Sequence, residues 1–391
     1  MLPLTANIGL GFSDLAGLSS HIPKLRLQCA QLRAQQPEAG GRDSKRLKLQ
    51  PENSSMRIDT SLMFAPEVVA EMAGEMEAAG FDGAYAFEGQ NDPFVALAAA
   101  AMKTERLELM TSIAVAFARN PMNLAYLAND LQCLSKGRFI LGLGTQVKAH
   151  IERRFSMPWS RPASRMKEMV LAIKEIWSCW ETGEKLKFEG DFYNHTLMSP
   201  TFAPKLSEHG MPKIYLAAVG PKMTEVAGEV AEGYFVHPFH TSQSLEQLSL
   251  PAIDRGLQKA GKGRDGFEIS AQVIVATGLT EEAMEAAIFS ARNQIAFYAS
   301  TPAYRPVLEV HGWEDMQPEL TAMTKAGDWQ GLSNMVNDEI LHTFALVGTP
   351  EEVGAKMNAR LGGIVERVSP VIYQPDAELL TALLQAVRSH A

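Results

Sequence analysis

Glycine, proline and lysine stand together at residues 220–222, where the sequence predicts the passage from a buried strand to a helix. Amide N–H groups in the first turn of a helix lack partners within the helix and attract phosphate groups. Gly220 allows a ligand to approach the backbone, Pro221 opens the helix, and Lys222 adds positive charge. This spacing predicts phosphate binding, with an ordinary strand-to-helix turn as the alternative.

Residues 142–146 read Gly-Leu-Gly-Thr-Gln and look at first like a dinucleotide-binding loop. Val147 occupies the position of the third glycine, so that fingerprint fails. We interpret the stretch as a thin edge of the sheet, where a flat ring could lie against the backbone at Gly144 with polar contacts from Thr145 and Gln146. Glycines that serve only tight packing of the sheet are the alternative.

Candidate acid–base groups follow three of the predicted strands. Glu88 ends the second strand, and His150 lies shortly after the fourth. A carboxylate or imidazole at such a position could exchange a proton with a substrate, although a solvated turn carboxylate is the alternative for Glu88. His237 and His240 follow the sixth strand. Either could also donate a proton.

Two further features carry weaker predictions. Proline between His237 and His240 breaks helical geometry and no third ligand is evident, so we expect no metal. Arg119, beside Asn120 and Pro121, could hold a carboxylate or phosphate, with a surface charge as the alternative.

Composition excludes several classes of protein. The net charge of −9 argues against nucleic acid as the main partner, and no apolar run reaches the ~20 residues of a membrane helix. Three well-separated cysteines form no paired framework, which fits a reducing cytoplasm. We predict that Cys133 and Cys179 are buried as small apolar side chains.

The elements that carry these residues alternate between strands and helices from residue 56 onward. The eight predicted strands are short, apolar and rich in β-branched or aromatic residues: 58–62, 83–87, 107–115, 138–144, 213–219, 233–238, 267–276 and 368–373. The helices between and after them are 66–79, 93–103, 121–134, 161–182, 222–231, 245–260, 281–299 and 377–389. Eight such pairs predict a closed (β/α)8 barrel, whose active site lies at the carboxyl ends of its strands.

Insertions after the fourth and seventh strands interrupt this alternation. Residues 185–202 predict a β-hairpin with its turn at Gly190 and Asp191, and residues 301–346 form a longer segment. Trp313 and Trp329 in the longer segment suggest a packed lid. Residues 1–55 carry seven Lys or Arg against four Asp or Glu without sustained periodicity, and we expect a disordered extension with Met56 as the functional beginning.

Several of these stretches, taken in order, resemble the bacterial luciferase-like superfamily, and within it the oxidoreductases that use the deazaflavin coenzyme F420. The resemblance covers residues 56–391 and is carried by the segments 79–85, 92–94, 104–109, 119–121, 134–144, 161–168 and 220–221. It implies the barrel fold. It also implies a non-proline cis peptide in the third strand, at Ser112–Ile113, that supports the coenzyme ring. The coenzyme phosphate would lie at Val219, Gly220, Pro221, Lys222 and Met223.

One position departs from this family. Several relatives place an Asp-His pair at the end of the second strand, whereas this chain has Glu88 and Gly89 there. Glu88 can replace the carboxylate, but Gly89 supplies no imidazole. We therefore expect Glu88 and His150 to take the acid–base role of that pair.

The sequence thus predicts hydride transfer between coenzyme F420 and a small organic substrate. Phosphate anchoring, an apolar slot and one proton donor would be sufficient for that reaction. A monooxygenase that takes reduced FMN on the same barrel is the first alternative, and a catalytically silent cofactor-binding protein is the second. The resemblance also implies a homodimer.

Overall fold

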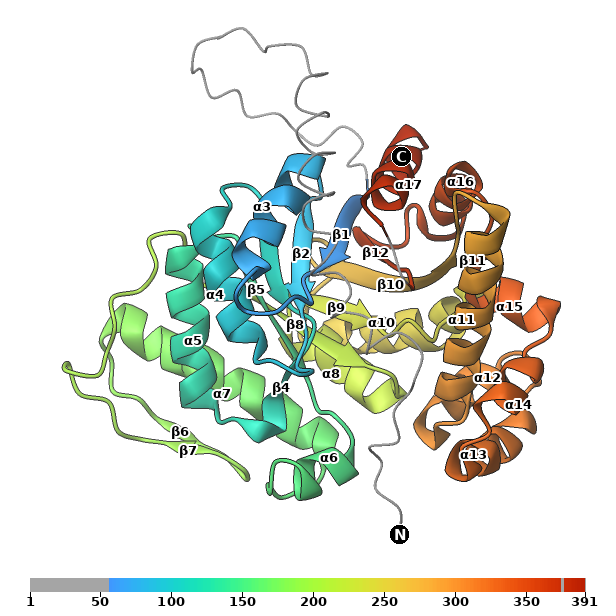
Figure 1. The fold of residues 1–391 in the computed structure, drawn as a ribbon. Coiled ribbons are helices and arrows are strands. Elements are labelled where there is room, and N and C mark those ends of the chain that lie inside the picture. Colours follow the sequence, from blue (N-terminus) through green and yellow to red (C-terminus); the bar gives the residue numbers. More distant parts are fainter. Residues whose placement is uncertain (1–55, 374–375, 391) are drawn as a thin grey trace, which may run out of the picture.

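The computed structural model describes residues 56–373 and 376–390. The extension predicted for residues 1–55 lies outside this part of the chain. Eight parallel strands form a closed ring, in the order β10-β12-β1-β2-β3-β5-β8-β9 with β9 pairing back to β10 (Figure 1). They are β1 (Arg57–Ser61), β2 (Gly83–Ala86), β3 (Glu108–Thr111), β5 (Phe139–Gly144), β8 (Lys213–Ala218), β9 (Gly233–Val236), β10 (Glu268–Ala276) and β12 (Arg367–Val371). The predicted barrel and all eight predicted strands are confirmed.

Short strands extend or decorate the ring. β4 (Ala114–Val115) pairs with β5, and β11 (Leu346–Val347) pairs with the end of β10. The predicted hairpin is present as β6 (Phe188–Glu189) and β7 (Asn194–His195). The predicted third strand of residues 107–115 is therefore divided into β3 and β4 by Ser112 and Ile113.

Helices surround the strands, and several begin where proline and a polar cap predict. They are α3 (Val69–Ala79), α4 (Pro93–Lys103), α5 (Pro121–Leu134), α6 (Lys148–Arg153), α7 (Pro162–Thr182), α8 (Pro221–Val230), α9 (Ser242–Ser244), α10 (Leu250–Lys259), α11 (Glu281–Ala299), α12 (Arg305–Glu309), α13 (Met316–Ala326), α14 (Trp329–Asn334), α15 (Asp338–Phe344), α16 (Pro350–Leu361) and α17 (Ala377–Ser389). The predicted helix 245–260 begins as a π-helical turn at Leu245–Ser249. Among the described residues no helix is both long and apolar enough to span a bilayer.

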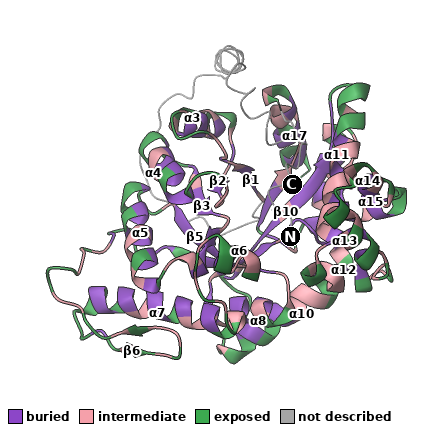
Figure 2. Ribbon diagram, turned by 60° about the horizontal axis from the view of Figure 1, so that its bottom comes forward, coloured by how far each residue is buried: buried purple, intermediate pink, exposed green. Residues whose placement is uncertain are grey.

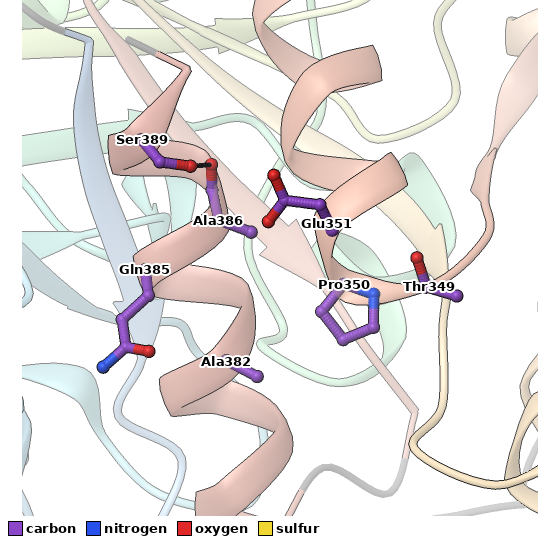
Figure 3. Close-up of a pocket in the computed structure, with 7 residues that line it drawn as sticks. All are labelled: Thr349, Pro350, Glu351, Ala382, Gln385, Ala386 and Ser389. Carbon is purple, nitrogen blue, oxygen red and sulfur yellow. Dashed lines mark hydrogen bonds between the residues drawn. The ribbon is translucent and has the colours of Figure 1, made fainter.

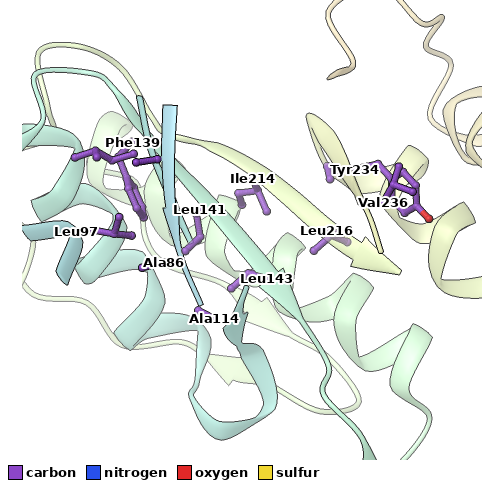
Figure 4. Close-up of a cluster of buried hydrophobic side chains, with 14 of the residues drawn as sticks. Ala86, Leu97, Ala114, Phe139, Leu141, Leu143, Ile214, Leu216, Tyr234 and Val236 are labelled. Carbon is purple, nitrogen blue, oxygen red and sulfur yellow. The ribbon is translucent and has the colours of Figure 1, made fainter. Parts of the chain in front are cut away.

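Alternation along the strands divides the apolar side chains into two layers. Ile140 and Tyr215 belong to the cluster inside the ring. Their neighbours Leu141, Ile214 and Leu216 belong to the larger core between strands and helices (Figure 4). Successive residues of a strand point to opposite faces, which explains this division. Buried residues accordingly fill the strands and the inner faces of the helices (Figure 2).

The insertion after β10 is larger than the sequence predicted. Helices α11 to α15 share an apolar core of their own, which Phe239 and Ile274 of the barrel join. The helix predicted at residues 281–299, ahead of the predicted insertion of residues 301–346, shares the insertion's core as α11. The helix that leads back to β12 is α16, which packs on α17 (Figure 1). Trp313 and Trp329 pack on the insertion's core, as expected for a packed segment.

One burial prediction is wrong. Cys179 is buried, but Cys133 is exposed because it lies in the last turn of α5 beside Leu134, which is itself 41% exposed. The apolar face of α5 is carried by Leu124, Ala128 and Leu131 instead.

Candidate active site

The strand is interrupted at the carboxyl end of β3, between β3 and β4. The Ser112–Ile113 peptide bond is cis, as the resemblance implied. The Ser112 N–H donates to the carbonyl of Ala86 (2.9 Å), and the Glu88 N–H donates to the carbonyl of Ile113 (3.1 Å). The segment of residues 112–113, called the β3–β4 bulge below, is therefore held from the end of β2.

Glu88 also holds this bulge through its side chain. Its Oε2 atom accepts hydrogen bonds from the Val115 N–H (2.8 Å) and from Nη1 of Arg119 (2.5 Å). Nη2 of Arg119 reaches Asp92 (2.7 Å), which also caps α4 by accepting from the Phe94 N–H. The Glu88 side chain is 9% exposed. Arg119 thus binds carboxylates of its own chain, and Glu88 is fixed rather than freely solvated.

Gly144 faces the bulge from the neighbouring strand. It pairs with Val115, and a Cβ atom placed on it would lie 2.8 Å from Cγ1 of Ile113. Gln146 follows with a φ of 59°, and its side chain accepts from the Val147 N–H (2.9 Å). Thr145 donates to the carbonyl of Gln146 (3.0 Å). The predicted ring-contact residues Ser112, Ile113, Gly144, Thr145 and Gln146 are therefore brought together.

The predicted phosphate segment opens α8 at the end of β8. Gly220 caps the helix with extended backbone (φ −86°, ψ 151°) and no side-chain cap, and a Cβ atom there would meet no atom within 4 Å. Lys222 is exposed. The Met223 N–H donates to the carbonyl of Gly220 (3.1 Å). Space and positive charge therefore remain at the start of α8, beside Val219 and Pro221.

His150 lies on α6, a helix that the sequence did not predict. Its buried Nδ1 atom has no hydrogen-bond partner within the described residues. Arg154, which follows α6, donates to the carbonyl of Gly89 (3.1 Å). The segment after β5 is thereby tied to the end of β2, on the same rim as Glu88.

His237 and His240 do not converge on a common point. Nδ1 of His237 lies 3.1 Å from the Phe239 N–H, and Nδ1 of His240 lies 3.0 Å from the carbonyl of His237. Burial lowers the pKa of His237 to about 3 and that of His240 to about 4. In the described ranges no group of three or more His, Cys, Asp or Glu could hold a metal ion.

Sequence reasoning missed the tyrosines that surround His237. Nε2 of His237 lies 3.1 Å from the hydroxyl of Tyr304, and Tyr298 packs against the same imidazole with ring centroids 4.7 Å apart. Both tyrosines come from the insertion after β10. No local pattern marks them, because their partner is some 60 residues earlier in the chain and only the tertiary fold brings them to the rim.

A separate hollow of about 440 Å³ lies between the start of α16 and the end of α17 (Figure 3). Its lining residues are Thr349, Pro350, Glu351, Ala382, Gln385, Ala386 and Ser389. An oxygen of the Glu351 carboxylate lies 2.7 Å from Nε2 of His390 there. None of the predicted site residues lines it.

The profile of the family described as luciferase-like monooxygenase matches residues 47–366. The chain belongs to this family. An uncharacterized protein of Mycobacterium tuberculosis is 47% identical over 333 residues, which cover 85% of this chain and 98% of that protein. The 5,10-methylenetetrahydromethanopterin reductase of Archaeoglobus fulgidus is 29% identical over 290 residues, which cover 72% of this chain and 82% of the reductase.

Solved structures of low sequence identity share the fold of this luciferase-like chain. The coenzyme F420 dependent tetrahydromethanopterin reductase from Methanopyrus kandleri has a TM-score of 0.70 at 23% identity, covering 87% of this chain and all of its own. The oxygenating constituent of 3,6-diketocamphane monooxygenase from Pseudomonas putida, in complex with FMN, has a TM-score of 0.60 at 16% identity. The match covers 85% of this chain and 97% of the Pseudomonas chain. The family and these relatives indicate an oxidoreductase-type enzyme that uses a flavin or deazaflavin.

Proposed function

We propose that this luciferase-like protein transfers a hydride between coenzyme F420 and a small organic substrate. The observation that carries the proposal is the rim itself, where Ile113 of the bulge lies against Gly144 and where α8 begins at Gly220 with open space. A side chain at Gly144 would press on Ile113 and displace it from the bulge, and a side chain at Gly220 would occupy the open space that the phosphate tail needs. The F420-dependent reductase of the same fold supports the choice of carrier.

Each predicted cofactor residue receives a role in this arrangement. Ser112 and Ile113 would support the ring from the bulge, and Gly144, Thr145 and Gln146 would border it from the end of β5. The phosphate tail would lie at Val219, Gly220, Pro221, Lys222 and Met223, where the start of α8 and the Lys222 ammonium group favour an anion.

Bound F420 would supply a carbon that gives or accepts a hydride and reacts poorly with oxygen. The chain must position a substrate, exclude water and move one proton. Glu88 and His150 are the acid–base candidates proposed from the sequence. Since Oε2 of Glu88 already accepts two hydrogen bonds, we propose that this carboxylate also positions the ring by fixing the bulge.

A monooxygenase that takes reduced FMN is the second candidate. The description of the family and the FMN complex of the Pseudomonas protein favour it. The barrel would be the same, and the difference would lie in the carrier and in the use of oxygen.

Titration of the full-length protein with F420 and with FMN, followed by absorbance, tests the proposal. We expect F420 to bind more tightly, and its reduced form to remain stable in air when bound. Tight FMN binding with oxygen consumption would establish the second candidate instead. Binding of F420 without any oxidation or reduction by a broad set of substrates would point to a silent cofactor-binding protein.

A further inference from the structure

An imidazole and three phenols lie together at the rim of the barrel, near the ends of β9 and β12 and away from the bulge that follows β3. We call His237, Tyr298, Tyr304 and Tyr373 the rim phenol cluster. His237 directly follows β9, and Tyr373 follows β12 by two residues. Tyr298 lies near the end of α11, and Tyr304 lies immediately before α12. Three different connections therefore deliver these side chains to one place.

The cluster adjoins the predicted phosphate segment. In the β8–β9 pair, Ala218 lies opposite Val236. The next residues, Val219 and His237, therefore leave the sheet side by side. The phosphate end of a coenzyme anchored at the start of α8 would therefore lie near the end of β9, which His237 follows.

Ring contacts hold the cluster together. The imidazole of His237 lies 4.6 Å from the ring of Tyr304, and the rings of Tyr298 and Tyr304 are 6.1 Å apart. All four residues of the cluster are nevertheless only partly buried. Packed aromatic rings that retain access at the mouth of a barrel are suited to meet a ligand.

The hydrogen bonds of His237 fix the direction in which Tyr304 can donate. Nδ1 of His237 faces the Phe239 N–H and must accept, so the neutral ring carries its proton on Nε2. Nε2–H then donates to the Tyr304 hydroxyl oxygen at 3.1 Å. The hydroxyl proton of Tyr304 therefore points away from His237.

Protonation is consistent with this direction. Burial, with the neighbouring His240, lowers the pKa of His237 to about 3, and burial raises the pKa of Tyr304 to about 12. The imidazole is therefore neutral and the phenol protonated near pH 7. Close by, the Tyr373 hydroxyl is buried and has no partner among the described residues.

We propose that the Tyr304 hydroxyl, oriented by His237, hydrogen bonds the reacting oxygen of the substrate and supplies its proton, and that this substrate is an uncharged carbonyl compound. The inference rests on the proposed use of F420. Phenols provide hydrogen bonds without a full positive charge, so they suit a neutral carbonyl better than a carboxylate or phosphate.

The proposed step balances as follows. A hydride from reduced F420 forms a C–H bond at the carbonyl carbon, and the carbonyl π electrons move to oxygen. The Tyr304 O–H bond breaks as that oxygen takes the proton, which gives an alcohol and oxidised F420. The phenolate left on Tyr304 is stabilised by Nε2–H of His237 and is reprotonated from water. His237 is a positioning residue in this step.

Full-length wild type and Tyr304→Phe test the step with named probes. Cyclohexanone, acetone and benzaldehyde are supplied with reduced F420, and the corresponding alcohols with oxidised F420. We expect turnover of at least one pair by wild type and a loss of about 100-fold or more in kcat for Tyr304→Phe, with KM and F420 affinity nearly unchanged. His237→Gln should lower kcat less, and the double variant should be no slower than Tyr304→Phe.

The control is Tyr126→Phe, which removes a phenol that donates to the Phe202 carbonyl outside the barrel. It should retain wild-type turnover. Failure of wild type to bind F420 would remove the proposed function itself. Binding of F420 with no turnover of any uncharged probe, or turnover retained in Tyr304→Phe, would overturn the inference about Tyr304 alone. If Tyr304→Phe fails to fold, the lower kcat at unchanged KM in His237→Gln decides the question.

Discussion

Glu88 illustrates how one carboxylate can serve both architecture and chemistry. It connects the end of β2 to the bulge through its N–H group and to Val115 and Arg119 through Oε2. Arg119 in turn lies over the ring of Phe94 and binds Asp92. Glu88 is therefore fixed by groups on the connection between β3 and α5, and its replacement can separate its positioning role from a role in proton transfer.

Substitution Glu88→Gln keeps an acceptor for the Val115 N–H but removes the charge. We expect turnover to fall by about 10- to 100-fold with F420 affinity changed by less than about threefold. Glu88→Ala removes the acceptor as well and should lower both turnover and F420 affinity. Steady-state kinetics and coenzyme titration measure the two effects. Full activity of Glu88→Gln would exclude a proton-transfer role.

Lys222 makes an electrostatic prediction at the start of α8. Because its side chain is exposed, Lys222→Ala should weaken F420 binding by about 1 kcal/mol, roughly fivefold, and the difference should shrink at high salt. Lys185→Ala, an exposed lysine before the β6–β7 hairpin, is the matched control. Fluorescence titration of F420 measures both. Equal affinity in Lys222→Ala and wild type would remove Lys222 from the phosphate site.

At the scale of elements, two glycines of β5 differ in which atoms an added side chain would meet. A Cβ atom on Gly142 would lie 1.7 Å from the backbone carbonyl oxygen of Thr111, which cannot move without breaking the strand pairing. A Cβ atom on Gly144 would press on the side chain of Ile113, which can rotate. The first glycine therefore serves the fold, and the second borders the proposed ring site.

Gly142→Ala should thus lower the free energy of unfolding by about 3 kcal/mol or more. Gly144→Ala should cost about 1 kcal/mol of stability yet weaken F420 binding about tenfold, because Ile113 would move toward the ring. Urea denaturation and coenzyme titration of both variants provide the comparison. Normal F420 affinity in Gly144→Ala would show that the ring does not approach this edge.

The strand pattern could be predicted because each barrel strand is short, apolar and bounded by glycine, proline or a polar cap. The same logic predicts α16, since Thr349 and Glu352 form a capping box after Gly348. The helices predicted from the sequence nevertheless do not include α16. Helices α12 to α15 are short and are stabilised by a shared core, which local propensity does not reveal.

Candidate cofactor-binding residues could be proposed from local sequence only at the end of β5 and the start of α8, where glycine and proline mark the chain within a few residues. The bulge at residues 112–113 was implied by the family resemblance alone. Contacts such as that between His237 and Tyr304 join separate connections, and the ion pair of Arg119 with Glu88 spans two strand ends. Neither follows from spacing along the chain.

At the scale of the whole molecule, charged rather than apolar side chains close the barrel at the amino ends of its strands. Arg57, Glu108, Lys213, Glu268 and Arg367 are each the first residue of a barrel strand. Arg367 is fully buried and binds Asp59 and Glu108. Burial alone would lower the pKa of Arg367, but these carboxylates raise it above its ordinary value. The network satisfies charges at this end of the barrel, away from the proposed active site.

Glu268 makes this network sensitive to acid. Burial opposes ionisation, yet hydrogen bonds from Lys213 and Tyr215 lower the pKa of Glu268 to about 2. Because the folded-state pKa is below the unfolded value, the carboxylate stabilises the fold above about pH 4.5, and this stabilisation is lost as the pH falls toward 2. The contribution near neutral pH is about 3 kcal/mol.

We therefore expect Glu268→Gln to unfold at lower urea concentration than wild type at pH 7, with the difference shrinking as the pH is lowered from 5 toward 2. Glu105→Gln, which removes an exposed partner of Lys136, should have little effect at any pH because water screens that pair. Urea titrations of the three proteins over this pH range measure the differences. A gap between wild type and Glu268→Gln that stays constant with pH would mean that the network at the amino ends stabilises the barrel by packing, without a contribution from the charge of Glu268.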